Sequence, residues 1–264
     1  MHKIRIVAVA LAALLALWGC KSSQGNNGGE QPSNNGEDAG NTEELGEDYE
    51  PPFYDEDPTV EPGEDNPDFE EYPNLSQVML PPGFQIRMYA EVPNARSLEL
   101  ADDGTLFVGN RSGDKVFAVQ DTDGDMKVDE TITIASGLTM PNGVALHEGD
   151  LYVAEVSKVW RFPGILESLP DVPEKELVND DFPTDRHHGW KFIAFGPDGK
   201  LYVPVGAPCN ICERDYNEYS NIMRMNPDGS ELEMYVKGVR NTVGFDWDPV
   251  SGDLWFTDNG RDNM

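Results

Sequence analysis

Short apolar segments separated by turns of Asp and Gly recur along residues 75–264 and predict β-strands. Four segments share one template, in which a small apolar strand, a turn and a second apolar strand with an aromatic residue follow one another. They lie at residues 101–108, 144–153, 195–203 and 247–256. An Asp-Gly pair readily adopts positive φ and so joins two antiparallel strands tightly. The pattern therefore predicts four hairpins.

The hairpins repeat with a longer period that predicts a β-propeller. The equivalent aromatic residues Phe107, Tyr152, Tyr202 and Trp255 are 45, 50 and 53 residues apart, a spacing typical of four-stranded blades. Further strands are expected at residues 115–119, 158–162 and 221–225. A β-sandwich is the alternative, but its turns recur faster, about every 8 to 12 residues. We expect an all-β propeller of about 3.5 four-stranded blades.

A propeller of the enzyme type usually closes with six or more blades, and residues 75–264 supply fewer than four. An open propeller leaves unpaired strand edges, which promote aggregation. We therefore expect that the gene continues beyond Met264 and that this chain is part of a six-bladed protein. On this reading, the fragment alone is inactive.

The N-terminus carries a basic start and then an apolar run from Ile6 to Trp18. This run is too short to span a bilayer and suits the core of a signal peptide. Residues 1–20 end in Leu-Trp-Gly-Cys and resemble the bacterial lipoprotein signal, which implies cleavage before Cys20 and lipid on Cys20 as the first residue of the mature protein. The protein would then be exported and held at a membrane surface of the cell envelope, on its periplasmic or extracellular face. An ordinary cleaved signal peptide is the alternative.

The charge is strongly acidic but unevenly spread. The chain has 49 acidic and 19 basic residues, a net charge of −30, which argues against a nucleic-acid partner. Residues 21–74 hold 17 of the acidic residues against the single base Lys21. Few apolar residues interrupt them, so we expect a disordered, self-repelling tether. A tail that binds cations or a partner is the alternative, and residues 75–264 are the folded domain.

Two motifs that directly precede inner strands contain the candidate catalytic residues. Residues 185–190 precede the inner strand of the third blade, and residues 239–244 precede that of the fourth. Such loops gather at one mouth of the central channel, so His187, His188 and Arg240 should meet there. A histidine accepts a proton near neutral pH and an arginine stays charged, so the pair suits proton removal from an alcohol. Structural or surface histidines are the alternative.

Several further motifs support a family resemblance from about Leu75 to the end. The chain resembles the soluble PQQ-dependent glucose/sorbosone dehydrogenases, which are six-bladed propellers. The resemblance implies that pyrroloquinoline quinone (PQQ) binds with Ca²⁺ at the channel mouth and that an aldose or sorbosone-like sugar is oxidised by hydride transfer to the quinone. The motifs are Leu80-Pro81-Pro82-Gly83-Phe84, residues 92–98, Pro141-Asn142-Gly143, His187-His188-Gly189, residues 195–199, Gly238-Val239-Arg240-Asn241 and Asp258-Asn259-Gly260.

The resemblance assigns roles to individual residues. His188 lies eight positions before the Gly of the Gly-Pro-Asp turn and matches the family's general base. Arg240 and Asn241 match the pair that contacts the quinone, with Arg240 placed to polarise a quinone carbonyl. Asn142 matches an Asn of the family's Gln-Asn-Gly motif, although Pro141 replaces the Gln.

The resemblance also implies a metal site. Gly260 and Arg261 match two residues whose backbone carbonyls hold the cofactor's Ca²⁺, and oxygen ligands suit this cation. A second calcium loop, at residues 121–132, is a weaker expectation. Met126 stands where such a loop has glycine, and Ile132 stands where it has glutamate. An acidic hairpin turn is favoured there. The carboxylates of the loop belong to Asp121, Asp123, Asp125 and Asp129.

Two cysteines, Cys209 and Cys212, are separated by two residues. Glu213 follows them in place of His, which excludes covalent haem attachment on the usual pattern. In an exported protein we expect a short-loop disulfide, with a redox or metal-binding pair as the alternative.

Two other functions remain open. A lipid-anchored propeller could bind a carbohydrate or protein without chemistry, and would tolerate loss of His188 and Arg240. A Ca²⁺-dependent lactonase would work without a quinone. The joint occurrence of the His-Gly and Arg-Asn motifs favours sugar oxidation, with an unknown electron acceptor.

Overall fold

The computed structural model describes residues 5–8, 68–81, 84–212 and 214–260. Contacts divide the chain into two compact units, residues 1–8 with 88–264 and residues 9–87. Strand β1 (Arg5–Ala8) pairs with β2 (Arg87–Glu91), and the rest of the predicted signal, with Cys20, lies outside the described residues. None of the helices in the described ranges is long and apolar enough to cross a bilayer.

The described part of residues 9–87 contains two short helices. Helix α1 spans Asp68–Glu71 and the 3-10 helix η1 spans Pro73–Gln77. The backbone N–H of Tyr72 donates to the Asp68 carbonyl at 2.7 Å, and Leu75 is 7% exposed. Disorder was predicted for residues 21–74, and within this range the structure describes residues 68–74, which form short helical turns with backbone hydrogen bonds. The remainder of the tether lies outside the described residues.

Residues 88–260 fold into antiparallel sheets in which each strand pairs with the next along the chain. Three sheets have four strands and one has two. Helix α2 (Ile165–Ser168) lies in the connection between β9 and β10. The first sheet contains β3 (Ala95–Leu100), β4 (Leu106–Asn110), β5 (Val116–Gln120) and β6 (Glu130–Ala135), and the second contains β7 (Gly143–His147), β8 (Asp150–Ala154), β9 (Val159–Phe162) and β10 (Glu176–Asn179). The third sheet contains β11 (Ala194–Phe195), β12 (Leu201–Val205), β13 (Asn221–Met225) and β14 (Glu233–Lys237). The last sheet contains β15 (Thr242–Trp247) and β16 (Leu254–Asp258).

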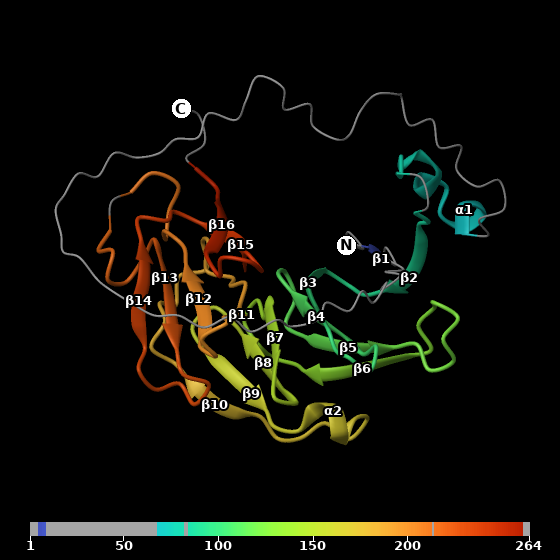
Figure 1. Ribbon diagram of the computed structural model, residues 1–264, viewed down its shortest axis with the longest axis horizontal. Helices are drawn as coiled ribbons and strands as arrows, with labels where there is room; N and C mark the ends of the chain where they lie inside the picture. The colour runs from blue at the N-terminus through green and yellow to red at the C-terminus, as the bar shows by residue number, and fades with distance from the viewer. Residues whose placement is uncertain (1–4, 9–67, 82–83, 213, 261–264) are drawn as a thin grey trace, which may run out of the picture. The chain divides into compact units, whose positions relative to one another are not determined.

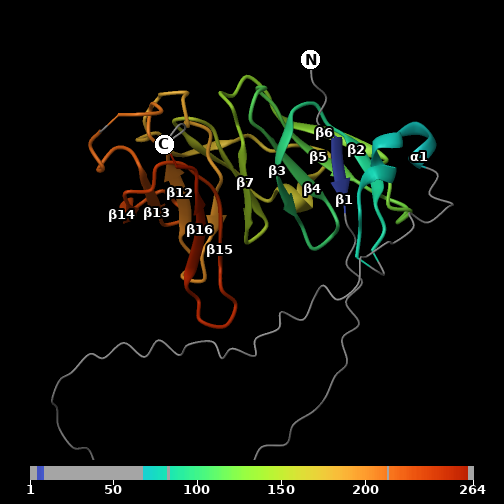
Figure 2. The ribbon, with the colours of Figure 1, turned by 90° about the horizontal axis from the view of Figure 1, so that it is seen from above.

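The sheets are the blades of a β-propeller. They follow one another along an arc, with β3, β7, β11 and β15 towards the middle and β6, β10 and β14 outside (Figure 1). Both views place β7 between β3 and the C-terminal sheets, and β7 contacts both β3 and β11 (Figure 2). Three full blades and half of a fourth are present in the described residues, as the sequence repeat predicted.

The repeated aromatic residues fill the spaces between blades. Phe107 and Tyr152 are 0% and 1% exposed, and Tyr202 is 2% exposed. Tyr152 packs with residues of the third sheet, and Tyr202 packs against Phe245 of the fourth. Burial of such side chains contributes about 1.5–3 kcal/mol each, so these contacts hold neighbouring blades together. Trp255 is 70% exposed, because within the described residues the fourth sheet has no further strand beside β16.

The charged side chain of Lys191 is almost completely enclosed in this core. Lys191 is 1% exposed; its Nζ donates to the Pro204 carbonyl at 3.4 Å and lies 5.0 Å from the Phe182 ring centroid. Burial lowers the pKa of Lys191 from its ordinary value of 10.5 to about 7. Between these two values, the unfolded chain binds a proton that the folded protein does not bind. The stability of the protein therefore rises with pH through this interval.

Replacing Lys191 by methionine should stabilise the protein in a pH-dependent way. Lys191→Met keeps the apolar stem and removes the buried ammonium. We expect the variant to have the higher melting temperature at pH 6, and the difference to shrink as the pH rises from about 7 towards 10. Thermal unfolding at several pH values measures this difference, with the exposed Lys237→Met as control. A difference that is independent of pH would contradict the account.

Candidate functional site

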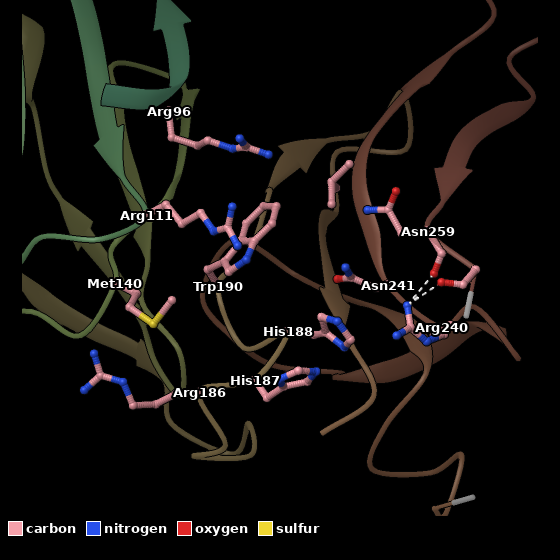
Figure 3. Close-up of a pocket in the computed structure, with 12 residues that line it drawn as sticks. Arg96, Arg111, Met140, Arg186, His187, His188, Trp190, Arg240, Asn241 and Asn259 are labelled. Atoms are coloured by element: carbon pink, nitrogen blue, oxygen red, sulfur yellow. Dashed lines mark hydrogen bonds between the residues drawn. The ribbon is translucent and has the colours of Figure 1, made fainter. Parts of the chain in front are cut away.

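One cavity lies where the inner strands of all four blades begin. It has a volume of about 620 Å³. Because successive strands are antiparallel, the starts of β3, β7, β11 and β15 share an edge with the ends of β4 and β16, so six segments meet there. The lining residues are Arg96, Arg111, Met140, Arg186, His187, His188, Trp190, Arg240, Asn241, Val243, Asn259 and Gly260 (Figure 3).

The cavity wall is cationic in a protein that is otherwise acidic. Four of the ten arginines line it, whereas no carboxylate side chain is among the described lining residues. The guanidiniums of these four arginines also form no ion pair within the described chain. Arg161 and Arg224, which lie elsewhere, each pair with carboxylates. The cavity is therefore suited to an anionic ligand.

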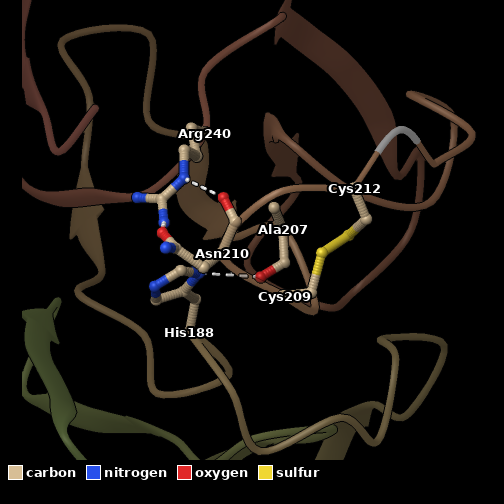
Figure 4. Close-up of a disulfide and its surroundings, with 6 residues drawn as sticks. All are labelled: His188, Ala207, Cys209, Asn210, Cys212 and Arg240. Carbon is tan, nitrogen blue, oxygen red and sulfur yellow. Dashed lines mark hydrogen bonds between the residues drawn. A yellow bond between two sulfur atoms is a disulfide. The ribbon is translucent and has the colours of Figure 1, made fainter. Parts of the chain in front are cut away.

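The backbone holds His188 in one orientation at this wall. Its Nδ1 lies 2.8 Å from the Ala207 carbonyl oxygen (Figure 4). A carbonyl only accepts hydrogen bonds, so Nδ1 carries the proton and Nε2 is the basic nitrogen of the neutral ring. His188 has a φ of 53°, and a Cβ at position 206 would lie 2.6 Å from the His188 Cβ. Gly206 is therefore required for this close approach.

Arg240 is fixed by hydrogen bonds to neutral oxygens. Its Nη1 donates to the Asn259 and Gly260 carbonyls at 2.7 and 2.8 Å, and its Nε donates to the Asn210 carbonyl at 3.2 Å. Its Nη2 donates to the Asn210 side-chain oxygen. A guanidinium has five N–H groups, so these bonds leave one N–H and the whole positive charge for a ligand.

The predicted disulfide supports both groups. The structure joins Cys209 to Cys212 in the loop that follows β12 (Figure 4). This loop supplies the Ala207 carbonyl to His188 and both Asn210 oxygens to Arg240. The disulfide therefore closes the loop that positions the two motifs.

The structure brings most, but not all, of the predicted residues to the cavity. His188, Arg240 and Asn241 line it, as their positions before inner strands predicted, and their chemical roles stay predictions. The backbone N–H of Asn241 donates to the Asp258 carboxylate at 2.7 Å. Asn142 is 0% exposed and lies behind the wall, so its role in cofactor binding also stays a prediction.

The structure describes one of the two predicted calcium ligands, so the metal site stays a prediction. Gly260 lines the cavity, but its carbonyl accepts a hydrogen bond from Arg240, and a guanidinium repels a cation. Arg261 lies outside the described residues. No carboxylate among the described lining residues compensates for this charge.

The acidic loop after β5 gathers three of its four predicted ligands. Carboxylate oxygens of Asp121, Asp123 and Asp129 lie within 4.8 Å of one another, and Asp125 is not part of the group. Met126 has a φ of 68°, so it makes the left-handed turn that usually takes glycine. The backbone N–H groups of the loop already satisfy several of the carboxylates. Calcium binding there stays a prediction.

The sequence motifs assigned no role to three residues of the cavity wall, although two of them lie within the motifs at residues 92–98 and 185–190. Arg96, Arg111 and Trp190 come from the first blade and from the loop before β11. Each guanidinium carbon lies 5.0 Å from the centroid of the Trp190 ring. Arg96 lies near the start of β3 and Arg111 directly follows β4, and no local pattern in the sequence shows that both approach Trp190.

Comparisons with known proteins identify a family and the fold. A family described as a domain of unknown function, DUF7133, matches residues 71–264. An uncharacterized protein of Borreliella burgdorferi is 24% identical over 210 residues, which are 72% of this chain and 51% of the relative. The chain therefore spans about half the length of that curated relative.

Solved structures with a similar fold include sugar dehydrogenases. The PQQ-bound aldose sugar dehydrogenase of Streptomyces coelicolor has a TM-score of 0.53 at 21% identity over 66% of this chain and 59% of its own. The PQQ domain of Coprinopsis cinerea pyranose dehydrogenase has a TM-score of 0.53 at 17% identity, over 64% and 44%. An AA12 carbohydrate-active enzyme of Trichoderma reesei has a TM-score of 0.56 at 23% identity, over 67% and 49%. At these identities the likeness establishes the propeller fold.

Removing the Asn210 side chain should loosen Arg240 and destabilise the protein. Hydrogen bonds to charged groups contribute about 1.5–3 kcal/mol, so we expect Asn210→Ala to lower the free energy of unfolding by about 1–3 kcal/mol. Denaturant unfolding measures the change. Asn217→Ala is a matched control, because this exposed side chain lies near the same loop. Equal stability of the two variants would contradict the role of Asn210.

Proposed function

Because this chain belongs to the DUF7133 family, whose function is unknown, we propose from the cavity itself that the protein binds PQQ and oxidises a sugar. The observation that carries the proposal is the placement of His188 and Arg240 on one cavity wall. His188 is a base whose protonated nitrogen is fixed, and Arg240 is a cation without a carboxylate partner. Both line the same cavity. Proton removal and stabilisation of negative charge need such a pair.

The chemistry of the cavity fits PQQ. The cofactor is a planar quinone with three carboxylates, and four arginines without carboxylate partners face a space of about 620 Å³. The remaining N–H of Arg240 can donate to a quinone carbonyl. Solved PQQ-dependent sugar dehydrogenases share the fold, which makes a sugar the favoured substrate class.

Two side chains have distinct tasks in the proposed reaction. His188 accepts the proton of the sugar hydroxyl at Nε2, while its Nδ1 hydrogen bond to Ala207 stabilises the imidazolium that forms. Arg240 stabilises negative charge that develops on an acceptor oxygen. Asn241, which is 8% exposed, borders the same space. Bound PQQ would supply the quinone that accepts the electrons.

Calcium has no part in the steps proposed here. The Gly260 carbonyl accepts a hydrogen bond from Arg240, so a cation bound to this oxygen would lie close to the guanidinium. The positive charge that calcium would supply is present as Arg240.

The location of the protein is also part of the proposal. The signal-like N-terminus supports export and lipid attachment at Cys20, which would hold the propeller at a membrane surface of the cell envelope. Electrons would then pass to an acceptor whose identity is unknown.

The test separates cofactor binding from chemistry by using two variants. PQQ affinity is measured by calorimetry on the protein expressed from its complete gene, since this chain spans about half of its relative. Arg240→Gln should weaken PQQ binding at least about tenfold, because it removes a cation and a donor. Arg161→Gln, outside the cavity, is the control for loss of one positive charge.

His188→Gln should give the opposite pattern. We expect PQQ affinity within about twofold of wild type and sugar oxidation with a dye acceptor lowered about 10²- to 10⁴-fold. Failure of the wild-type protein to bind PQQ would contradict the proposed function. Normal turnover of the His188 variant would contradict the role of this base and would favour a different chemistry.

A further inference from the structure

We propose that Arg96, Arg111 and Trp190 form a carboxylate-binding subsite on the cavity wall opposite Arg240. The carboxylate belongs either to an acidic sugar or to the quinone. These two candidate ligands follow from the proposed function, on which the inference rests. Figure 3 shows Arg96, Arg111 and Trp190 on one side of the cavity and Arg240, Asn241 and Asn259 on the other, with His188 between them.

The two arginines are held together without a compensating charge. Both guanidinium carbons lie 5.0 Å from the centroid of the Trp190 ring, a distance at which cation–π attraction operates. No carboxylate of the described residues forms an ion pair with either of them, whereas Arg161 and Arg224 each have such partners. Two cations at one ring repel each other, and a bound anion would remove this repulsion.

Buried asparagines fix the backbone on which the subsite stands. Asn142 is 0% exposed, and its Nδ2 donates to Ser97 Oγ at 2.8 Å and to the Lys191 carbonyl at 2.7 Å. Ser97 is adjacent to Arg96, and Lys191 is adjacent to Trp190. One asparagine side chain therefore joins the strand that carries Arg96 to the loop that carries Trp190.

A second asparagine does the same for Arg111. Asn110 is 3% exposed, its Nδ2 donates to the Pro93 carbonyl at 2.9 Å, and its Oδ1 accepts from the Ser112 N–H at 3.2 Å. These bonds hold the turn in which Arg111 lies. Trp190 itself is 7% exposed, so a rigid base supports both guanidiniums. Preorganised donors of this kind bind an anion with little loss of conformational entropy.

The number of free N–H groups on each arginine favours anion recognition at Arg96 and Arg111. Four of the five N–H groups of Arg240 already donate to backbone and amide oxygens. The guanidiniums of Arg96 and Arg111 make no hydrogen bond to the described residues, so their planar forks can bind a carboxylate through two parallel N–H groups. A ligand that spans the cavity would place a carboxylate here and its reacting end near His188.

The experiment uses three ligands and three variants of the protein expressed from its complete gene. D-glucuronate and D-glucose differ by the carboxylate alone, and PQQ is the third ligand. Affinities are measured by calorimetry for wild type, for Arg96→Gln/Arg111→Gln and for the double lysine variant, with Arg161→Gln as control. Melting temperatures show that each variant is folded.

We expect the double glutamine variant to lose at least about tenfold in affinity for glucuronate or for PQQ, with glucose binding unchanged. Loss of glucuronate binding assigns the carboxylate to the substrate, and loss of PQQ binding assigns it to the cofactor. The double lysine variant should recover only part of the affinity, because lysine lacks the fork.

Three results would overturn the subsite. They are unchanged affinity for both acids in a folded glutamine variant, full affinity in the lysine variant, and absence of binding of both acids to wild type. Failure of PQQ alone to bind would instead contradict the proposed function, because glucuronate still reports on the subsite.

Discussion

The arrangement of the cavity depends on the hydrogen bonds of one guanidinium. Arg240 donates to Asn210 in the loop after β12 and to Asn259 and Gly260 after β16, and its carbonyl accepts from the Ala207 N–H at 2.8 Å. Through Ala207 the same loop orients His188. The loops of the third and fourth blades are thus joined at the cavity by bonds to neutral oxygens, which leave the charge of the arginine uncompensated.

This charge explains why the cavity differs from the rest of the surface. The chain carries a net charge of −30, and much of its acidic character lies in residues 21–74 and in the turns. At the cavity the sign is reversed, with arginines from several blades converging on a space that no described carboxylate lines. Clustering of like charges opposes folding unless a ligand offsets it. The propeller therefore combines a stable apolar packing between blades with an opening organised for an anion.

Much of the fold could be predicted, because its signals are local. The Asp-Gly turns and the spacing of Phe107, Tyr152 and Tyr202 predicted the blades. The two motifs that precede inner strands predicted that His188 and Arg240 lie at the cavity. Arg96 and Arg111 could not be found in this way, since only the packing of the first blade against the others brings them to Trp190. Burial of Asn142 was equally invisible, because its partners Ser97 and Lys191 are distant in sequence.

The most direct measurement is a crystal structure of the protein expressed from its complete gene and grown with PQQ. The account predicts quinone density within the cavity, with a ring carbonyl at Arg240, the His188 Nε2 facing the reacting edge, and the Cys209–Cys212 loop unchanged. Density for the quinone at another place, or a cavity filled by the protein's own carboxylates, would contradict the central claim that this opening is an anion site built around His188 and Arg240.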